Sequence, residues 1–142
     1  MKLTATKCPL TEIEKLRRLY LQENNFQIRY NAYHARYWSD SWLLSVDDIA
    51  VGYGSVKGKE NIKDRDAVFE FYIVPPFRQY SVEMFQTLLD ESRAAYIECQ
   101  SNDLFLTSLT YEFSKSITSD VVLLREHVTT SLKNPGVIFR AK

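Results

Sequence analysis

A carboxylate and an arginine flank a strand-to-helix junction in the middle of the chain. Residues 68–74 read Val-Phe-Glu-Phe-Tyr-Ile-Val, which is typical of a buried strand apart from Glu70. Burial raises the pKa of a carboxyl group toward neutrality, so Glu70 is a candidate general base. The alternative is that Glu70 pairs with an arginine and has a structural role. Arg78 follows the strand, where its guanidinium could hold an anion.

The junction itself predicts an anion site. Pro75 and Pro76 end the strand, because proline has no N–H to donate to a sheet. Apolar residues then recur at helical spacing and predict a helix that starts near residues 79–81; they are Val82, Phe85, Leu88 and Leu89. A strand that leads directly into a helix leaves unpaired N–H groups at the positive end of the helix dipole. Those groups would bind an anion.

Composition limits the classes of function. A chain of 142 residues predicts one domain. Lys plus Arg and Asp plus Glu both number 18, so a nucleic-acid partner is not expected. Cys8 and Cys99 lack metal-ligand spacing, so we expect two reduced thiols and no metal site. The sequence shows no apolar leader and no membrane-length apolar run, so we expect a cytoplasmic protein without a membrane partner.

Strand-like and helix-like segments alternate along the chain. Strands are predicted at residues 2–7, 41–46, 49–56, 67–74, 96–100, 121–124 and 137–139, with Asp47-Asp48 as a hairpin turn. Helices are predicted from Thr11, as N-cap, to residue 24, over 26–38, from the 79–81 start to 89, and from 104 to 113 or 117. The order β-α-α-β-β-β-α-β-α-β-β predicts an α/β (α+β) protein, a mixed sheet of about seven strands flanked by four helices.

The predicted helix over residues 26–38 carries an aromatic face. Tyr30, Tyr33 and Tyr37 recur there at helical spacing with Phe26 and Trp38. This face could line a substrate cleft, which makes the three tyrosines candidate substrate-binding residues. The alternative is that the face packs on the sheet as core.

The element order, the central strand–turn–helix and the length resemble the GNAT acetyltransferases, which have the acyl-CoA N-acyltransferase fold, over nearly the whole chain. In that family the central strand ends in Val-x-Pro, here Val74-Pro75-Pro76, and an Arg/Gln-rich loop opens the helix, here residues 78–83. The resemblance implies that acetyl-CoA is the acyl donor and that loop amides hold its pyrophosphate. The donor-binding residues that it implies are Tyr72, Ile73, Val74, Arg78, Gln79, Tyr80, Ser81, Val82, Glu83 and Asn102.

The loop departs from the family pattern at two positions. Ser81 and Glu83 stand where the family has glycines, which let the backbone come close to the phosphates. A carboxylate at Glu83 suits the helix dipole but would repel a pyrophosphate. Arg78 would offset part of that repulsion if it reached the same phosphates.

The resemblance also implies the reaction. It predicts direct transfer of an acetyl group to an amine of a small molecule or a protein, with Glu70 as base and Tyr111 as the acid that protonates the leaving thiolate. A packing role is the alternative for Tyr111. Asn102 is expected to bind the pantetheine arm or to cap its helix. His34 and His127 are isolated in the sequence and are expected to be surface or packing residues.

A narrower resemblance opens a second hypothesis. Glu-Phe-Tyr-Ile-Val-Pro-Pro-Phe-Arg, Glu-Cys-Gln-Ser-Asn-Asp and Pro-Gly-Val-Ile-Phe-Arg are similar to segments of a GNAT-like group in which such a unit can precede a second acetyltransferase domain. The chain would then be a catalytically inactive module that binds a ligand or a protein, accessory to another acetyltransferase domain. The sequence leaves open whether the chain forms a homodimer.

Overall fold

A computed structural model describes residues 1–24, 26, 29–100, 102–115, 117–123 and 136–141; within the last two ranges it describes the backbone. Residue 124, the last of the strand predicted over 121–124, and His127 therefore lie outside the described residues. The chain folds around one seven-stranded sheet in the order β1-β2-β3-β4-β5-β7-β6, which confirms the predicted mixed sheet. Its strands are β1 Leu3–Cys8, β2 Ser39–Val46, β3 Ile49–Lys57, β4 Ala67–Ile73, β5 Tyr96–Gln100, β6 Ile117–Leu123 and β7 Gly136–Ala141.

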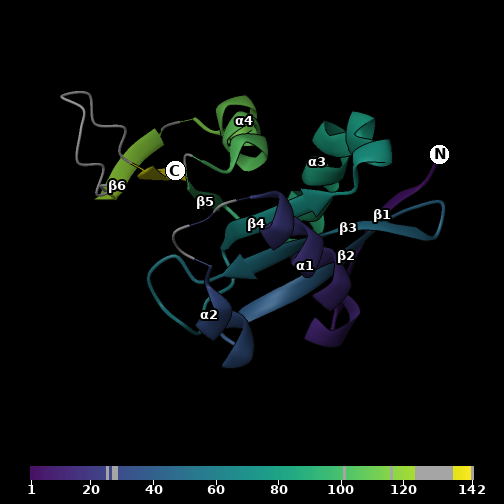
Figure 1. Ribbon diagram of the computed structural model, residues 1–142, viewed down its shortest axis with the longest axis horizontal. Helices are drawn as coiled ribbons and strands as arrows, with labels where there is room; N and C mark the ends of the chain where they lie inside the picture. Colours follow the sequence, from purple (N-terminus) through teal and green to yellow (C-terminus); the bar gives the residue numbers. More distant parts are fainter. Residues whose placement is uncertain (25, 27–28, 101, 116, 124–135, 142) are drawn as a thin grey trace.

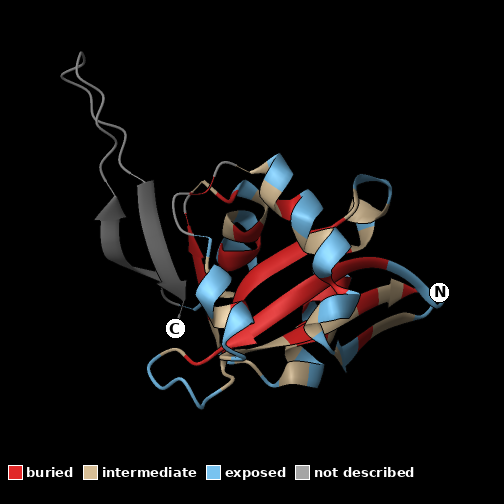
Figure 2. Ribbon diagram, turned by 60° about the horizontal axis from the view of Figure 1, so that its bottom comes forward, coloured by how far each residue is buried: buried red, intermediate tan, exposed pale blue. Residues whose placement is uncertain are grey.

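Four α-helices cover this sheet, as predicted. They are α1 Glu14–Glu23, α2 Asn31–Ala35, α3 Ser81–Ser92 and α4 Leu104–Phe113, and two 3-10 helices, Leu10–Glu12 and Pro75–Tyr80, precede α1 and α3. Helices α1 and α2 lie on one face and α3 and α4 on the other (Figure 1). The strands between them are largely buried, while the outer sides of the helices are exposed (Figure 2). Apolar area removed from water on both faces stabilises this arrangement.

The two faces of the sheet have different cores. On the α3 and α4 face, aliphatic and aromatic side chains of the helices pack on the strands; Met84, Phe85, Leu88, Leu106 and Leu109 are all at most 3% exposed. On the α1 face the core is smaller and richer in tyrosine, with Tyr20, Tyr53 and Tyr72 beside Ile13 and Phe26. Tyrosine hydroxyls need partners when they are buried. The α1 face therefore contains most of the buried polar groups described below.

Strands β4 and β5 separate soon after they begin. They are the parallel pair of the sheet and are paired at Ala67 with Tyr96 and at Val68 with Ile97. Beyond those pairs β4 continues to Ile73, and none of the described strands pairs with it on that side. A bulge in β4 adds to the divergence, because Val68 and Glu70 pair with adjacent residues of β3 and Phe69 is the extra residue between them. The result is a V-shaped gap at the carboxyl ends of β4 and β5.

The hairpin between β2 and β3 forms as its sequence predicts. Asp47 and Asp48 both have positive φ, at 49° and 67°, as a two-residue hairpin turn requires. A Cβ added to Gly52 would lie 2.0 Å from the carbonyl oxygen of Tyr72, so this glycine allows β3 to approach β4 closely. A glycine inside a strand is typical of such a close backbone approach.

Three helix predictions were wrong in part. The predicted helix over 26–38 is the short α2, because Tyr30 and Tyr37, at φ of 56° and 57°, break the helical path. The first long helix has Ile13 at its N-cap instead of Thr11, because a 3-10 turn follows Pro9 first. Ile117 starts β6 and does not extend α4.

Candidate functional site: the gap between β4 and β5

Glu70 of β4 is buried at the centre of a polar cluster under α1 and α2. The Nε of Arg17 donates to Oε1 at 3.0 Å and its Nη2 donates to Oε2 at 3.0 Å. The hydroxyl of Tyr53 donates to Oε1 at 3.0 Å, and His34 Nε2 lies 2.9 Å from the same oxygen. Glu70 itself is 1% exposed. The carboxylate is therefore fully engaged.

These partners correct the prediction for the pKa of Glu70. Burial by itself would raise that pKa, but the hydrogen bond and charge of His34 and of Arg17 outweigh burial and lower it below 4.5. A carboxylate held this way is a weak base and has no free lone pair aimed at a substrate. The structure therefore contains the alternative that the sequence left open, in which Glu70 pairs with an arginine, here Arg17.

A cavity of about 180 Å³ lies in the gap between β4 and β5. Side chains from both faces of the sheet line it: Tyr20, Glu23 and Asn24 from α1 and its end, Phe71 and Tyr72 from β4, Arg78, and Asp103, Leu104 and Phe105 at the start of α4. The cavity therefore lies beside β4, between α1 and the start of α4, the helix that follows β5. Tyr72 and Arg78 are the two residues predicted to bind the donor that line it.

Asp103 is the buried acid of this cavity. It is 2% exposed and is the N-cap of α4, where its Oδ1 accepts the N–H of Leu106 at 3.0 Å. Its Oδ2 accepts the hydroxyl of Tyr20 at 2.9 Å. Burial raises the pKa of Asp103 to about 6, although both hydrogen bonds lower it. Asp103 therefore changes protonation state close to neutral pH, as a proton-transfer group does.

The backbone of β4 faces the same gap. Val74 N–H bonds across to Val51 O of β3, whereas Ile73 O accepts a bond from the Arg78 side chain. Because alternate residues of a strand direct their N–H and C=O to opposite sides, the peptide groups of Phe71 and Ile73 point toward the gap. Beyond the last β4–β5 pair, no described strand occupies that side. This open strand edge offers donors and acceptors to an extended ligand.

Arg78 bridges the mouth of the gap. Its Nε donates to Ile73 O at 2.9 Å and its Nη2 contacts a Glu23 carboxylate oxygen at 2.6 Å. The guanidinium lies 5.6 Å from the centroid of the Tyr72 ring and 5.5 Å from that of Phe105. The ion pair with Glu23 is more than a third exposed on both sides, so releasing it costs about 1 kcal/mol or less.

The predicted loop of free amides is a 3-10 helix that continues into α3 at Ser81, within the predicted range for the helix start. Pro75 and Pro76 have no N–H, and the N–H of Phe77 donates to Val74 O. The N–H and the hydroxyl of Ser81 both donate to Arg78 O. The N–H groups of Phe77 and Ser81 are therefore not open to a pyrophosphate.

The other predicted donor-binding residues lie around this 3-10 helix or at α4. Gln79, Val82 and Glu83 are exposed, while Tyr80 is half-buried and packs against the α3 core. Glu83 lies in the first turn of α3, as predicted, and its side chain faces solvent. Asn102 directly precedes Asp103, so the cap that the sequence predicts over residues 101–103 is formed by Asp103.

Tyr111, the predicted acid, lies on α4 and is 65% exposed. The described walls of the gap cavity do not include it. That exposure does not favour the packing role, and proton donation to a thiolate stays a prediction. The Tyr20 hydroxyl is the one that lines the cavity and contacts Asp103.

The aromatic residues after α1 separate into two groups. Tyr30 and Tyr33 pack on Phe69 of β4, with centroids 5.2 and 6.1 Å from its ring. Together they surround the buried Lys57, whose Nζ is 2.7 Å from Glu98 Oε2. Tyr37 is 79% exposed. Tyr30 and Tyr33 thus pack on the sheet, which is the alternative to a substrate cleft, whereas Tyr37 is exposed and accessible to a ligand.

Sequence reasoning placed Asp103 in a helix cap but missed its burial, its partner Tyr20 and the partners of Glu70. An aspartate between a strand and a helix is a cap signal, but nothing near it in the sequence indicates its burial. Its partner Tyr20 is 83 residues away. Within the described part of the chain, no cluster of residues has the composition of a metal site, and no helix is long and apolar enough to span a membrane.

The sequence matches the acetyltransferase (GNAT) domain family over residues 9–127. The chain belongs to the GNAT acetyltransferases. No curated protein matches the sequence significantly. The family match agrees with the geometry, since the parting strands and the open β4 edge lie at the centre of the matched region.

Solved GNAT structures share the fold at low sequence identity. The structure of yncA from Salmonella typhimurium, with its cofactor acetyl-CoA, has a TM-score of 0.59 and 14% identity, and the match covers 100% of this chain and 94% of that one. A chimera of the spermidine N-acetyltransferase SpeG from Vibrio cholerae and hSSAT has a TM-score of 0.61 and 11% identity, and the match covers 99% of this chain and 95% of that one. A GNAT-family acetyltransferase from Colwellia psychrerythraea has a TM-score of 0.66 and 14% identity, and the match covers 93% of this chain and 49% of that protein. Identities this low establish the fold alone.

Proposed function

We propose that the protein is an acetyl-CoA-dependent N-acetyltransferase whose donor lies in the gap between β4 and β5. The observation that carries the proposal is the open edge of β4, where the peptide groups of Phe71 and Ile73 face a gap in which no strand of the described residues pairs with them. A pantetheine arm is an extended chain with two amides, so it can bond to such an edge as an added strand does.

The diphosphate of the donor would bind to Arg78 and not to a loop of free amides. Arg78 lies at the mouth of the gap, and its exposed ion pair with Glu23 is weak. A diphosphate offers a guanidinium two bidentate partners, which is a stronger contact. Binding therefore requires Arg78 to move away from Glu23 and Ile73.

Asp103 would accept the proton of the attacking amine. Acetyl-CoA supplies the acetyl group as a thioester, so a C–N bond forms as the C–S bond breaks, and coenzyme A would leave as its thiolate. Asp103 lies in the wall of the gap, and its pKa of about 6 leaves it mostly ionised at neutral pH yet still basic. Tyr20 holds this carboxylate in place through its hydroxyl. Glu70 has no place in this step, because its lone pairs are already used.

The acceptor is an amine of a small molecule or of a protein. Among proteins of the same fold, one is a chimera of a spermidine N-acetyltransferase and another is RimL, a ribosomal L7/L12 alpha-N-protein acetyltransferase. Both acceptor classes are primary amines, which fits proton transfer to a carboxylate.

A second function, an inactive accessory module, is favoured by one observation. The N–H groups of Phe77 and Ser81 already donate to carbonyl oxygens of the chain, and the two residues before Phe77 are prolines. The chain also spans about half of the Colwellia protein that it matches. If the module hypothesis holds, acetyl-CoA will not bind at all.

Calorimetry and thermal unfolding with acetyl-CoA distinguish the two functions. Donor at about 100 times its dissociation constant should stabilise the fold by roughly 2.7 kcal/mol. Arg78→Gln should weaken that binding about tenfold, because a charge-assisted contact to phosphate is lost. Arg18→Gln, at an exposed position of α1, is the matched control and should bind as the parent does. Absence of any binding would overturn the transferase proposal.

Turnover tests the assignment of the base. Asp103→Asn keeps the shape of the side chain and can still cap α4, so acetyl-CoA affinity should stay within about twofold while kcat falls at least about a hundredfold. A variant that turns over as fast as the parent would remove Asp103 from the mechanism.

A further inference from the structure

Glu23, the last residue of α1, lines the gap cavity and has two partners there. Its Oε2 lies 2.6 Å from Arg78 Nη2, and its Oε1 accepts the hydroxyl of Tyr72 at 3.1 Å. The bond from Tyr72 involves no atom of Arg78. It would therefore still hold the carboxylate at the cavity wall after Arg78 had moved away.

The charged groups in the described lining of the gap cavity are two acids and one cation. Glu23 and Asp103 are the acids, and Arg78 is the cation. Donor binding as proposed moves Arg78 from Glu23 to the diphosphate, which leaves that described lining with two acids and no cation of its own. Asp103 would take the proton of the attacking amine. Glu23 is then a carboxylate without a counter-ion, and such a group attracts a positively charged ligand.

The aromatic walls beside the two acids suit an aliphatic ligand. The rings of Tyr20 and Tyr72 are adjacent, with centroids 6.2 Å apart. The hydroxyl of Tyr20 contacts Asp103 and the hydroxyl of Tyr72 contacts Glu23, so each acid lies beside one ring of this pair. When Arg78 leaves, it also uncovers the ring of Tyr72, whose centroid is 5.6 Å from the guanidinium. The face of that ring can attract an ammonium group.

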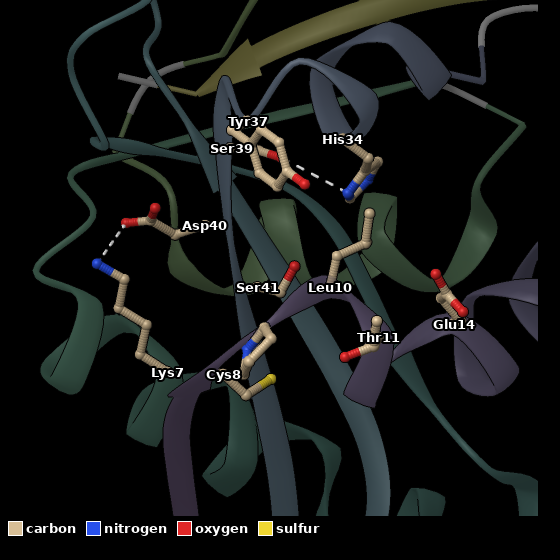
Figure 3. Close-up of a pocket in the computed structure, with 11 residues that line it drawn as sticks. Lys7, Cys8, Leu10, Thr11, Glu14, His34, Tyr37, Ser39, Asp40 and Ser41 are labelled. Atoms are coloured by element: carbon tan, nitrogen blue, oxygen red, sulfur yellow. Dashed lines mark hydrogen bonds and ion pairs between the residues drawn. The ribbon is translucent and has the colours of Figure 1, made fainter.

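A larger cavity, on the α1 and α2 face, is separate from the gap. Its volume is about 360 Å³, and its described lining shares no residue with that of the gap cavity. Figure 3 shows that Lys7 points toward Asp40, its ion-pair partner at 3.4 Å. Strands β3 and β4 lie between the gap and β2, whose start lines this larger cavity. A charge on an acceptor in the gap must therefore be met by the gap's own residues.

We propose that the acceptor is a small aliphatic diamine or polyamine, whose reacting amine lies at Asp103 and whose second ammonium group binds Glu23 once Arg78 has moved to the donor. This inference rests on the proposed acetyl transfer and adds the class of the acceptor and the residue that recognises it. Coenzyme A and a diamine should each raise the affinity of the other by the same factor, because Arg78 and the diamine compete for Glu23. A monoamine has no group for Glu23 and should show no such coupling.

Calorimetry with coenzyme A, putrescine and butylamine tests the exchange of partners. Putrescine and butylamine have the same carbon chain, but putrescine has an amine at each end. Putrescine should bind about threefold to fivefold more tightly to protein saturated with coenzyme A than to the protein alone, as expected for an exposed ion pair. Butylamine should bind equally weakly to both. Equal affinity of putrescine for the two forms, or no binding of putrescine to either, would overturn the inference.

Glu23→Gln tests the residue, because it removes the charge and keeps an oxygen for the hydroxyl of Tyr72. Putrescine should bind this variant with the same affinity with and without coenzyme A. Coenzyme A itself should bind about threefold to fivefold more tightly, since Arg78 no longer has an ion-pair partner. Glu91→Gln makes the same change at an exposed position of α3 and should behave as the parent does. Coupling that persists in Glu23→Gln would overturn the role of Glu23.

Turnover separates a failure of this inference from a failure of the proposed function. In the parent, kcat/KM should be higher for putrescine than for butylamine. Glu23→Gln should lower the ratio of the two values about threefold to fivefold, mainly through the KM for putrescine, because Glu23 binds the acceptor away from its reacting amine. Equal acetylation of the two amines by the parent would overturn this inference and leave the acetyltransferase in place. Absence of acetyl-CoA binding would overturn both.

Discussion

Two buried acids contact tyrosines of the core on the α1 face: Glu70 contacts Tyr53 and Asp103 contacts Tyr20. Their other partners give the two carboxyl groups different pKa values. Glu70 is 1% exposed and Asp103 is 2% exposed, so burial does not distinguish them. Glu70 is bonded to a guanidinium and an imidazole, which lower its pKa, whereas Asp103 is bonded to a backbone N–H and a phenol, and its pKa is about 6. The comparison teaches that the partners of a buried carboxylate decide whether it can transfer protons near neutral pH.

The largest effect should follow from removing the cation of the first site. Arg17→Met leaves Glu70 buried and ionised without its guanidinium partner, so the free energy of unfolding should fall by about 3 to 5 kcal/mol in urea denaturation. Arg18→Met, at the next position of α1 and exposed, should change it by about 0.5 kcal/mol or less. The double variant Arg17→Met with Glu70→Gln should recover part of the loss, since it no longer has an unpaired carboxylate buried at residue 70. Equal stability of Arg17→Met and Arg18→Met would contradict the comparison.

The pH dependence of stability should identify the second site. The pKa of Asp103 is about 6 in the folded protein and 3.8 for the unperturbed group, so the folded state binds this proton more tightly. The stabilisation is full below the unfolded pKa and is lost as pH rises through the folded pKa. Relative to wild type, Asp103→Asn should therefore become more stable by on the order of 2 to 3 kcal/mol between about pH 4 and about pH 7. A difference between the two proteins that is constant over this range would refute the shifted pKa.

A smaller effect is expected at the mouth of the gap. Glu23→Gln removes the charge that holds Arg78 but keeps an oxygen to accept the hydroxyl of Tyr72. Stability should change by about 1 kcal/mol or less, and acetyl-CoA should bind about threefold to fivefold more tightly because Arg78 is free to reach the phosphates. Glu91→Gln is again the control. Weaker binding in Glu23→Gln would show that Glu23 positions Arg78 for the donor.

The smallest effect concerns Glu83. Its side chain is exposed in the first turn of α3, so salt and water screen its repulsion of a diphosphate. Glu83→Gln should tighten acetyl-CoA binding about twofold at low salt and have no effect at about 1 M salt. Binding that weakens in this variant would contradict a repulsive role.

Local sequence patterns predicted the frame of the molecule. The hairpin at Asp47-Asp48, β5 and the strand–helix junction at Pro75 follow from turn chemistry and apolar spacing, which act over a few residues. The helix over 26–38 failed because the aromatic spacing of Tyr30 and Tyr33 reflects packing around Lys57 and not a helical path. A pattern of burial can thus imitate the pattern of a helix.

The candidate site was only half predictable for a related reason. The stretch containing Glu70 and Arg78 is visible in sequence, but the pKa of Glu70 depends on Arg17 and His34, which are 53 and 36 residues away. The burial of Asp103 depends on Tyr20 in the same way. Contacts over such separations are set by the packing of α1 and α2 on the sheet, so composition near Glu70 could indicate burial but not the sign of the pKa shift.

The most direct test of the difference between the two acids is a titration of their side-chain carboxyl carbons by NMR, with Glu70→Gln and Asp103→Asn used for assignment. The account predicts that the Asp103 signal moves with a midpoint near pH 6 and that the Glu70 signal stays in its ionised position down to below 4.5. If the Glu70 signal titrates near neutral pH while that of Asp103 titrates near pH 3.8, Glu70 would be the better candidate for the base, and the account would be contradicted.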